Sequence, residues 1–210
     1  MIAVGIVAHD SRADQARALA DTVGADVLSV DDGSLGCDDN HDLVLSRLSS
    51  TKADWVVILE DDAAPIPDFR GQVTCALTAA PTPIVSLYLG RQRPPWAQVA
   101  VQAGITEADT VGASWLVSSH LLHAVAYAIR TPLVDGVLNF LSGFPVDQHV
   151  TAYAQAHGHL ISYAWPSLVD HLDQPTLVDH PDNQPRTPGR VAYRVGARTE
   201  WSTRTASIRL

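Results

Sequence analysis

Three consecutive carboxylates, Glu60, Asp61 and Asp62, follow an apolar run in the segment WVVILEDDAAP, residues 55–65. Like charges at adjacent positions repel, so these acids need solvent, hydrogen-bond donors or a cation nearby. Carboxylate oxygens suit hard divalent ions such as Mg²⁺ or Mn²⁺, which bind diphosphates and act on them as Lewis acids. The segment therefore predicts a divalent metal site or a solvated acidic rim, and both interpretations remain open.

The elements around these acids predict an α/β fold. The run 55–59 has no polar alternation, which is typical of a strand buried on both faces of a parallel sheet. Residues 2–8 and 26–30 predict two further strands, joined by a helix with Ser11 as its N-cap and Gly24 at its end. These segments form a β-α-β unit, and a second helix from about residue 40 to 50 leads into the third strand.

Polar side chains follow each of these three strands. In open α/β sheets, ligands bind outside the carboxyl ends of the strands. The residues that we expect to line one such crevice are His9, Asp31, Asp32, Asp61 and Asp62.

The second half of the chain predicts further alternation of helices and strands. Asp68 is a candidate cap for a helix reaching about residue 80, and Asp147 lies at a predicted helix start near the positive pole of the helix dipole. The other predicted elements are strands at 83–90, around Val99, at 111–117 and at 160–164, a loop at 91–98, and a helix over 119–129 with Ser118 as cap.

Length and composition favour a single domain. The chain has 210 residues, of which 46% are hydrophobic and 18% charged, enough to bury a substantial core. No run approaches the ~20 apolar residues that a membrane span requires. Two cysteines without metal-type spacing favour a reduced compartment, so we expect a cytoplasmic protein. The phosphate-binding patterns G-x-G-x-x-G and G-x-x-x-x-G-K-[ST] are missing, which excludes the nucleotide folds that depend on them.

Charge is divided unevenly along the chain. The net charge is -9, but the segment 186–210 carries six Arg and one Glu, so it contributes +5 and residues 1–185 contribute -14. Three interpretations of the basic segment remain open: it closes over phosphates, it contacts a polyanionic acceptor, or it pairs with the acidic body.

Five segments in order resemble GT-A-fold glycosyltransferases, most closely the lipopolysaccharide-type and procollagen-galactosyltransferase group. ADWVVILEDDAAPIPDF is similar to the segment in which a buried strand ends in an E-D-D version of the D-x-D motif. The other segments that carry the resemblance are DDGSLGCDDNHDLVLSRLSSTKADW, VGASWLVSSHLLHAV, PVDQHVTAYAQAHG and WPSLVDH. The resemblance covers about residues 1–171, and the ending RVAYRVGARTEWSTRT resembles small actinobacterial and phage-encoded proteins of this type.

The resemblance implies a Rossmann-like, mostly parallel mixed sheet flanked by helices over residues 1–171, with an irregular tail, residues 172–210, packed on or closing over the site. It implies transfer of a sugar from a nucleoside-diphosphate sugar to an acceptor hydroxyl, with Mn²⁺ or Mg²⁺ on the diphosphate and inversion at the sugar. The acceptor remains open between a glycan, a protein and, if a phage encodes the chain and it works in the host cytoplasm, a modified DNA base.

The same resemblance assigns roles to individual residues. Asp62 would hold the metal with Glu60 or Asp61 assisting, and His171 would complete the metal or diphosphate site. The residues it implies at the nucleotide are Asp31 and Asp32 at the nucleoside and His9 and Arg12 near the base or diphosphate. Asp147 would be the general base that removes the acceptor proton.

Each role has a structural alternative. Asp147 is also a candidate helix N-cap, and Asp31 and Asp32 precede a glycine and are candidate turn residues. His180 repeats the local sequence of His171 and competes with it. The histidine pairs 120/123 and 157/159 have no third ligand nearby in sequence, which argues against zinc there.

Two other function classes compete with the glycosyltransferase hypothesis. A metal-dependent phosphotransferase or phosphohydrolase of the haloacid-dehalogenase type uses a strand-end aspartate as nucleophile, but its motif follows the first strand, whereas here the acids follow the third. A non-catalytic module that binds a nucleotide or glycan would keep the fold without turnover.

Overall fold

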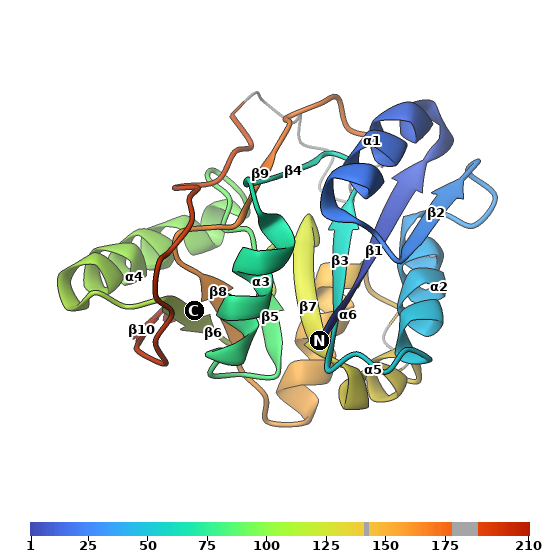
Figure 1. Ribbon diagram of the computed structural model, residues 1–210. Coiled ribbons are helices and arrows are strands. Elements are labelled where there is room, and N and C mark those ends of the chain that lie inside the picture. Colours follow the sequence, from blue (N-terminus) through green and yellow to red (C-terminus); the bar gives the residue numbers. More distant parts are fainter. Residues whose placement is uncertain (141–142, 178–188) are drawn as a thin grey trace.

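The computed structural model describes residues 1–140, 143–177 and 189–210, and it is built on a mixed sheet of eight strands (Figure 1). In spatial order the strands are β10 (Thr205–Ser207), β6 (Trp115–Ser118), β8 (Ile161–Ala164), β5 (Ile84–Ser86), β7 (Ala126–Arg130), β3 (Trp55–Glu60), β1 (Ile2–His9) and β2 (Val27–Asp31). A separate antiparallel pair consists of β4 (Ala63–Pro65) and β9 (Val169–His171).

Helices connect most of these strands. Within the described residues the α-helices are α1 (Ala13–Val23), α2 (Cys37–Ser49), α3 (Phe69–Thr78), α4 (Gln98–Val111), α5 (Thr131–Leu138) and α6 (Val146–Ala156). Short 3-10 helices at Asp10–Arg12 and Pro95–Ala97 precede α1 and α4.

Parallel and antiparallel pairs both occur in the sheet, and the pairs that β1 forms with its two neighbours are all parallel. β1 lies between β2 and β3 and is parallel to both, while β5 is parallel to β8 and β10 is parallel to β6. β7 runs antiparallel to both β3 and β5, and β6 is antiparallel to β8. The prediction of an α/β fold with a mostly parallel mixed sheet flanked by helices is confirmed.

The sheet separates two hydrophobic clusters, and the central strands contribute alternate residues to each. In β1, Val4 and Ile6 pack with α1 and α3, whereas Ala3 and Val7 pack with the cluster that includes α2, α4, α5 and α6. A Cβ at Gly5 would collide with Val44 of α2, so the close approach of this helix to β1 requires glycine. Strands covered on both faces explain the continuous apolar runs in the sequence.

The first β-α-β unit follows the prediction closely. Gly24 adopts a left-handed conformation with φ of 60° and ends α1. The start of α1 differs, because Ser11 lies in the preceding 3-10 helix and Arg12 occupies the N-cap position. Asp68 precedes α3 as predicted, but its side chain makes no capping hydrogen bond.

The predicted helix over residues 119–129 is wrong. Residues 119–125 are irregular and Ala126–Arg130 forms β7, inserted between β3 and β5. Ala126 and Ala128 face one hydrophobic cluster, and Tyr127 and Ile129 face the other. A strand buried on both faces produces the same short apolar run as a buried helix, so the pattern does not distinguish them.

The predicted strand around Val99 is also wrong, because this residue lies in α4. Val101, Gly104 and Ala108 are the buried positions of this helix, and their spacing of three and four residues is helical. The strands predicted at 83–90 and 111–117 are shorter than expected, at Ile84–Ser86 and Trp115–Ser118.

The C-terminal segment contributes to the fold rather than forming only a loop. β10 extends the sheet beside β6, and the ring of Trp201 lies 5.0 Å from that of Trp115, measured between centroids. His180 lies outside the described residues. Among the described residues, no helix has both the length and the apolar character needed to cross a membrane.

Candidate functional site

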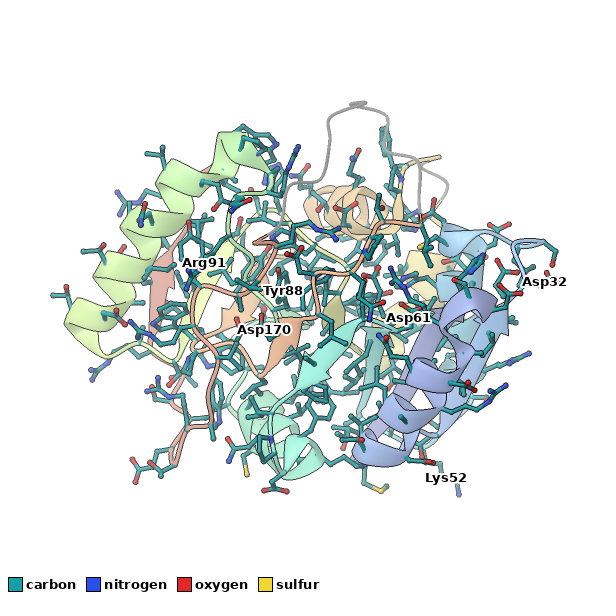
Figure 2. The ribbon with its side chains drawn as sticks, turned by 90° about the horizontal axis from the view of Figure 1, so that it is seen from above. Asp32, Lys52, Asp61, Tyr88, Arg91 and Asp170 are labelled. Carbon is teal, nitrogen blue, oxygen red and sulfur yellow. The ribbon has the colours of Figure 1, made fainter. Side chains whose placement is uncertain are left out.

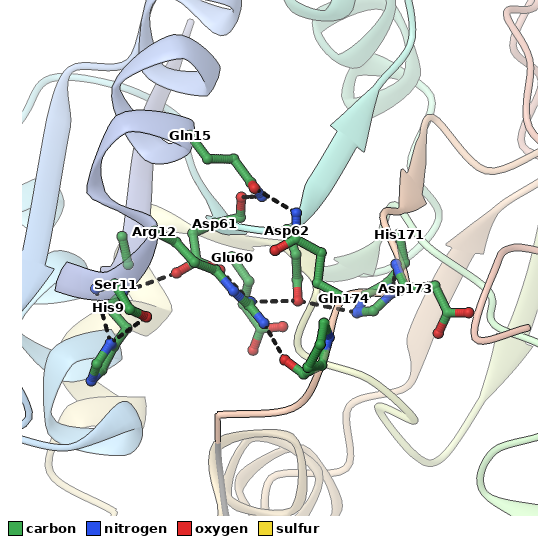
Figure 3. A network of polar contacts seen from close by, with 12 residues as sticks. His9, Ser11, Arg12, Gln15, Glu60, Asp61, Asp62, His171, Asp173 and Gln174 are labelled. Atoms are coloured by element: carbon green, nitrogen blue, oxygen red, sulfur yellow. Dashed lines mark hydrogen bonds and ion pairs between the residues drawn. The ribbon is translucent and has the colours of Figure 1, made fainter. Parts of the chain in front are cut away.

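Of the three acids at the end of β3, Asp61 and Asp62 are joined to Arg12, and Glu60 is not (Figure 3). Val56 and Ile58 face the cluster that contains α2, so Glu60, two residues further, points to the same side. Asp61 and Asp62 follow the strand and contact Arg12, which precedes α1 on the opposite face. The contacts of Glu60 thus lie on the α2 side, whereas Asp61 and Asp62 share the contact with Arg12.

Arg12 bridges the two aspartates. Its Nη1 atom lies 2.8 Å from Asp61 Oδ1 and 2.8 Å from Asp62 Oδ2. The three side chains are only 12%, 8% and 11% exposed, so this is a largely buried ion network. Arg12 also donates from Nη2 to the carbonyl oxygen of Pro175, which links it to the segment after β9.

Asp61 is held by further hydrogen bonds from the first strand and helix. The backbone N–H of His9 donates to its Oδ2 atom at 2.9 Å, and the side-chain amide of Gln15 donates to its carbonyl oxygen at 2.6 Å. The same Gln15 accepts a hydrogen bond from the side chain of Gln174 at 2.7 Å. These bonds join the ends of β1 and β3 into one polar network.

His171, the last residue of β9, orients Asp62. Its Nδ1 atom accepts the backbone N–H of Asp173 at 2.8 Å, which leaves the proton of the neutral ring on Nε2. Nε2 lies 3.3 Å from Asp62 Oδ2. Burial raises the pKa of Asp62, but the hydrogen bond of His171 and the charge and hydrogen bond of Arg12 outweigh it and hold that pKa below its ordinary value.

One oxygen of Asp62 remains without a partner. Its Oδ1 atom is buried and accepts no hydrogen bond from any described residue. A buried carboxylate oxygen without a donor is costly, and a bound cation is one way to satisfy it. Asp61 and Asp62 therefore fit a divalent ion, provided that Arg12 gives way.

Asp147 lies in the first turn of α6, and burial raises its pKa to about 6. The backbone N–H of Gln148 lowers this pKa and the negative charge of Glu60 raises it. The expectation that the helix terminus would favour the ionised form is thus outweighed by burial. The N-cap interpretation of Asp147 is wrong, because Pro145 holds that position.

Asp38 provides the capping interaction of α6 from another helix. Its Oδ1 atom accepts the backbone N–H of Val146 at 2.9 Å, 108 positions away in the chain. The same carboxylate raises the pKa of Asp147 through its charge. The starts of α2 and α6 therefore meet beside Glu60, and sequence patterns gave no signal for this contact.

Asp31 and Asp32 have the geometry of turn residues. Asp31 accepts the backbone N–H groups of Leu35 and Gly36 at 3.0 and 2.9 Å, and Asp32 accepts that of Ser34 at 3.1 Å. The bond from Leu35 is the main cause that lowers the pKa of Asp31, and the side chain and then the backbone N–H of Ser34 lower that of Asp32. Asp32 lies at the periphery, away from Asp61 (Figure 2).

The side chain of His9 remains at the surface beside the network. Its ring Nδ1 accepts the backbone N–H of Ser11 at 3.2 Å, and only its backbone contacts Asp61. Of the predicted site residues, the structure joins His9, Arg12, Asp61, Asp62 and His171 in one network. Asp31 lies opposite His9 in the β1–β2 pair, but its carboxylate and that of Asp32 bind the following turn.

A second cluster, not expected from the sequence, lies on the α2 side of β3. Cys37, His41 and Glu60 offer ligand atoms that all lie within 4.8 Å of one another. The two cysteines do not come together, and Cys37 reaches this cluster through its helix neighbour His41 rather than through Cys75. The signal for this cluster was the four-residue separation of Cys37 from His41, which places both side chains on one helix face.

The histidine pairs remain apart from any such cluster. His123 is buried with its ring 5.1 Å from that of Tyr88, whereas the ring of His120 lies 5.5 Å from that of Trp96. Among the described residues, Cys37, His41 and Glu60 are the only group of three potential metal ligands within this spacing.

No protein-family model matches this chain, and no curated protein matches it significantly.

Proposed function

We propose that this chain is a glycosyltransferase of the GT-A type, which moves a sugar from a nucleoside-diphosphate sugar to an acceptor hydroxyl with a divalent cation. The observation that carries the proposal is the unpartnered, buried Oδ1 atom of Asp62 at the carboxyl end of a central strand. The mixed α/β sheet is compatible with such a fold, since ligands bind at this edge of open sheets.

The donor diphosphate has a candidate position beside Arg12. A pocket of about 430 Å³ is lined by residues 10–15 and Gln174, a volume within the range of small-molecule sites. The guanidinium of Arg12 suits bidentate recognition of phosphate oxygens. α1 begins at Ala13 in the wall of this pocket, so the positive end of its dipole also favours an anion there.

Asp61 and Asp62 are the residues that would hold Mn²⁺ or Mg²⁺. When bound, the ion would neutralise the departing diphosphate. In the structure the guanidinium of Arg12 binds these same two carboxylates. When the donor binds, Arg12 would have to leave the aspartates and bind the phosphates instead. His171 keeps Asp62 oriented by donating to Oδ2, and ligation by its Nε2 atom would require that proton to leave.

Asp147 is the candidate base for the acceptor. With a pKa of about 6 it is mostly ionised at neutral pH and still basic enough to receive a proton. In the proposed step the acceptor oxygen forms the new bond to the anomeric carbon, the bond to the diphosphate breaks, and the acceptor proton passes to Asp147. Attack from the side opposite the diphosphate would invert the sugar.

A non-catalytic nucleotide-binding module is the second candidate, and one observation favours it. Arg12 compensates the charges of Asp61 and Asp62, so the two carboxylates do not require a cation, and a phosphate could be bound by the guanidinium instead. Metal-independent binding without turnover distinguishes this candidate from the enzyme.

The test is thermal unfolding with a panel of nucleoside diphosphates and their sugars, each with and without Mn²⁺. We expect a stabilisation of roughly 2.7 kcal/mol at a hundredfold excess of ligand over its dissociation constant. It should depend on Mn²⁺, disappear in Asp62→Asn, and persist in the control Asp21→Asn, an exposed position on α1. Release of nucleoside diphosphate from the stabilising sugar nucleotide then tests turnover.

Each other outcome has a definite meaning. Stabilisation that is equal without Mn²⁺ and in Asp62→Asn, with no product released, supports the binding module. No stabilisation by any nucleotide contradicts both candidates and leaves the aspartates as a structural ion network with Arg12.

A further inference from the structure

The cluster of Cys37, His41 and Glu60 is assembled by two regular elements. Cys37 is the first residue of α2 and His41 lies one helical turn further, so both side chains share one face. Glu60 ends β3 and points to this face because Ile58, two residues earlier, packs in the same hydrophobic cluster as α2. The separation of the three ligand atoms is thus fixed by a helix and a strand, not by a loop.

His41 is the observation that indicates a missing ligand. Its side chain is 0% exposed, yet Nε2 forms no hydrogen bond with any described residue. Glu60 Oε1 lies 3.5 Å from this nitrogen, an ion-pair distance without hydrogen-bond geometry. This buried ring nitrogen lies near a carboxylate and a thiol but forms a hydrogen bond with neither. A nitrogen so placed is in the position of a metal ligand.

The other ring nitrogen has the partner that a metal-bound histidine needs. His41 Nδ1 lies 3.1 Å from the hydroxyl oxygen of Tyr127, a fully buried residue of β7. If Nδ1 carries the proton and donates it to this oxygen, Nε2 has a free lone pair directed at the cluster. Such a second hydrogen bond fixes the tautomer and the ring orientation of histidine ligands.

We propose that Cys37, His41 and Glu60 bind a Zn²⁺ ion. Its fourth coordination position would be open to a water molecule or to an oxygen atom of the acceptor substrate. Thiolate, imidazole and carboxylate are all common zinc ligands, whereas a thiolate is unsuited to Mg²⁺. This site is distinct from the one proposed on Asp61 and Asp62, because Arg12 reaches that pair from the other face of the sheet.

The ligand atoms of Cys37, His41 and Glu60 need to move only slightly closer together to bind one zinc ion. Ligand atoms on a tetrahedral zinc ion lie roughly 3.5 Å apart, given bond lengths of about 2.0 to 2.3 Å. The separation between His41 and Glu60 already has this value, and the whole cluster lies within 4.8 Å. Rotation of the Cys37 or Glu60 side chain supplies the remainder, because the cysteine is partly exposed and the glutamate side chain is 27% exposed.

The charge balance also favours a cation. The carboxylates of Glu60, Asp38, Asp61 and Asp147 all lie close enough to the Cys37 thiol to act on it through their negative charge. Binding of Zn²⁺ forms the sulfur–zinc bond and releases the thiol proton to solvent. The same acidic surroundings disfavour the competing interpretation of Cys37 as a free nucleophilic thiolate.

The test uses Co²⁺ as a spectroscopic substitute for Zn²⁺ in the whole chain, after metal has been removed with a chelator. We expect one Co²⁺ per chain, a thiolate-to-cobalt charge-transfer band, tetrahedral d–d bands, and their loss when Zn²⁺ is added. Cys37→Ser should lose the charge-transfer band, and the matched control Cys75→Ser, at an exposed free cysteine, should keep it.

Two further variants separate this proposal from folding defects and from the proposed transferase. Asp62→Asn should keep the cobalt spectrum, because its carboxylate belongs to the other site. Glu60→Gln should weaken Co²⁺ binding while circular dichroism remains unchanged. Absence of the charge-transfer band in the unmodified chain, or an equal band in folded Cys37→Ser, would overturn the zinc site and leave the glycosyltransferase proposal untouched.

Discussion

Asp38 Oδ1 accepts the backbone N–H of Val146 at 2.9 Å, and this bond fastens the start of α6 to the start of α2. Asp147 follows Val146 directly, so the position of the candidate base depends on a residue in a different helix. The bond also supplies a capping acceptor that Pro145, the N-cap residue of α6, does not supply.

Removal of this acceptor should destabilise the fold. We expect Asp38→Ala to lower the free energy of unfolding by about 1 kcal/mol, the usual value of a lost cap. Asp39→Ala is the matched control, since Asp39 is exposed in the same first turn and makes no such bond to α6. Chemical denaturation measures both, and equal effects of the two substitutions would contradict the capping role.

Arg12 should be the most sensitive charged residue of the network. We expect Arg12→Met to destabilise the fold by roughly 3–5 kcal/mol, because two nearly buried carboxylates then face each other uncompensated. Mn²⁺ should restore part of this loss if the aspartates can hold a cation. Arg17→Met removes only an exposed pair with Asp14 and should change stability by less than about 1 kcal/mol. Failure of Mn²⁺ to restore any stability would count against the metal site.

Asp147 should make stability depend on pH in an unusual direction. Its folded pKa, about 6, exceeds the ordinary 3.8, so between these values the folded state binds more protons than the unfolded state. Stability therefore falls as pH rises through this window, and the penalty is complete above pH ~6. We expect Asp147→Asn to be more stable than the native chain at pH 7.5, by on the order of 1–3 kcal/mol, and equal to it near pH 4. Denaturation at the two pH values measures the difference, and an equal difference at both would contradict the assignment.

The same residue gives an expectation for activity. Asp147→Asn should lower the rate of sugar transfer by roughly 10²- to 10⁴-fold, as expected on removal of a general base, while donor binding persists. The native rate should rise with pH through an apparent pKa near 6. Single-turnover transfer from bound donor measures both. A rate that is unaffected by the substitution would assign proton removal to another group.

Tyr127 offers a test of the zinc site that leaves its ligands in place. We expect Tyr127→Phe to weaken Zn²⁺ binding by roughly 10- to 100-fold, because His41 loses the partner of its Nδ1 atom. Tyr193→Phe, a change remote from α2, should leave binding unchanged. Competition between Zn²⁺ and a chromophoric chelator measures the affinities.

The sequence predicted the edge of the sheet at which the candidate site lies. It did not predict that Glu60 and the pair Asp61 and Asp62 would contact different elements. Successive strands ending in polar residues indicated a crevice, and Arg12, Asp61 and Asp62 do meet there. The alternation of side chains along a strand, extended one residue beyond Leu59, is the sequence feature that places Glu60 on the α2 side, apart from the two aspartates.

Other features depended on contacts that no local pattern contains. β7 was predicted as a helix because its apolar run suits either structure, and only its insertion between β3 and β5 decides the matter. The bond from Asp38 to Val146 joins residues 108 positions apart. Asp31 and Asp32 were ambiguous in sequence, and the hydrogen bonds to the following loop resolve their geometry as that of a turn.

β10 pairs in parallel with β6 and covers what would otherwise be an open edge of the sheet. During synthesis, Trp115–Ser118 leaves the ribosome long before Thr205–Ser207, so for that interval the outer edge of β6 has unpaired backbone groups. Such edges pair readily with other chains. Nascent or truncated forms that lack residues 205–207 are therefore expected to aggregate or to require chaperones, even where the β1–β2–β3 part of the sheet is already complete.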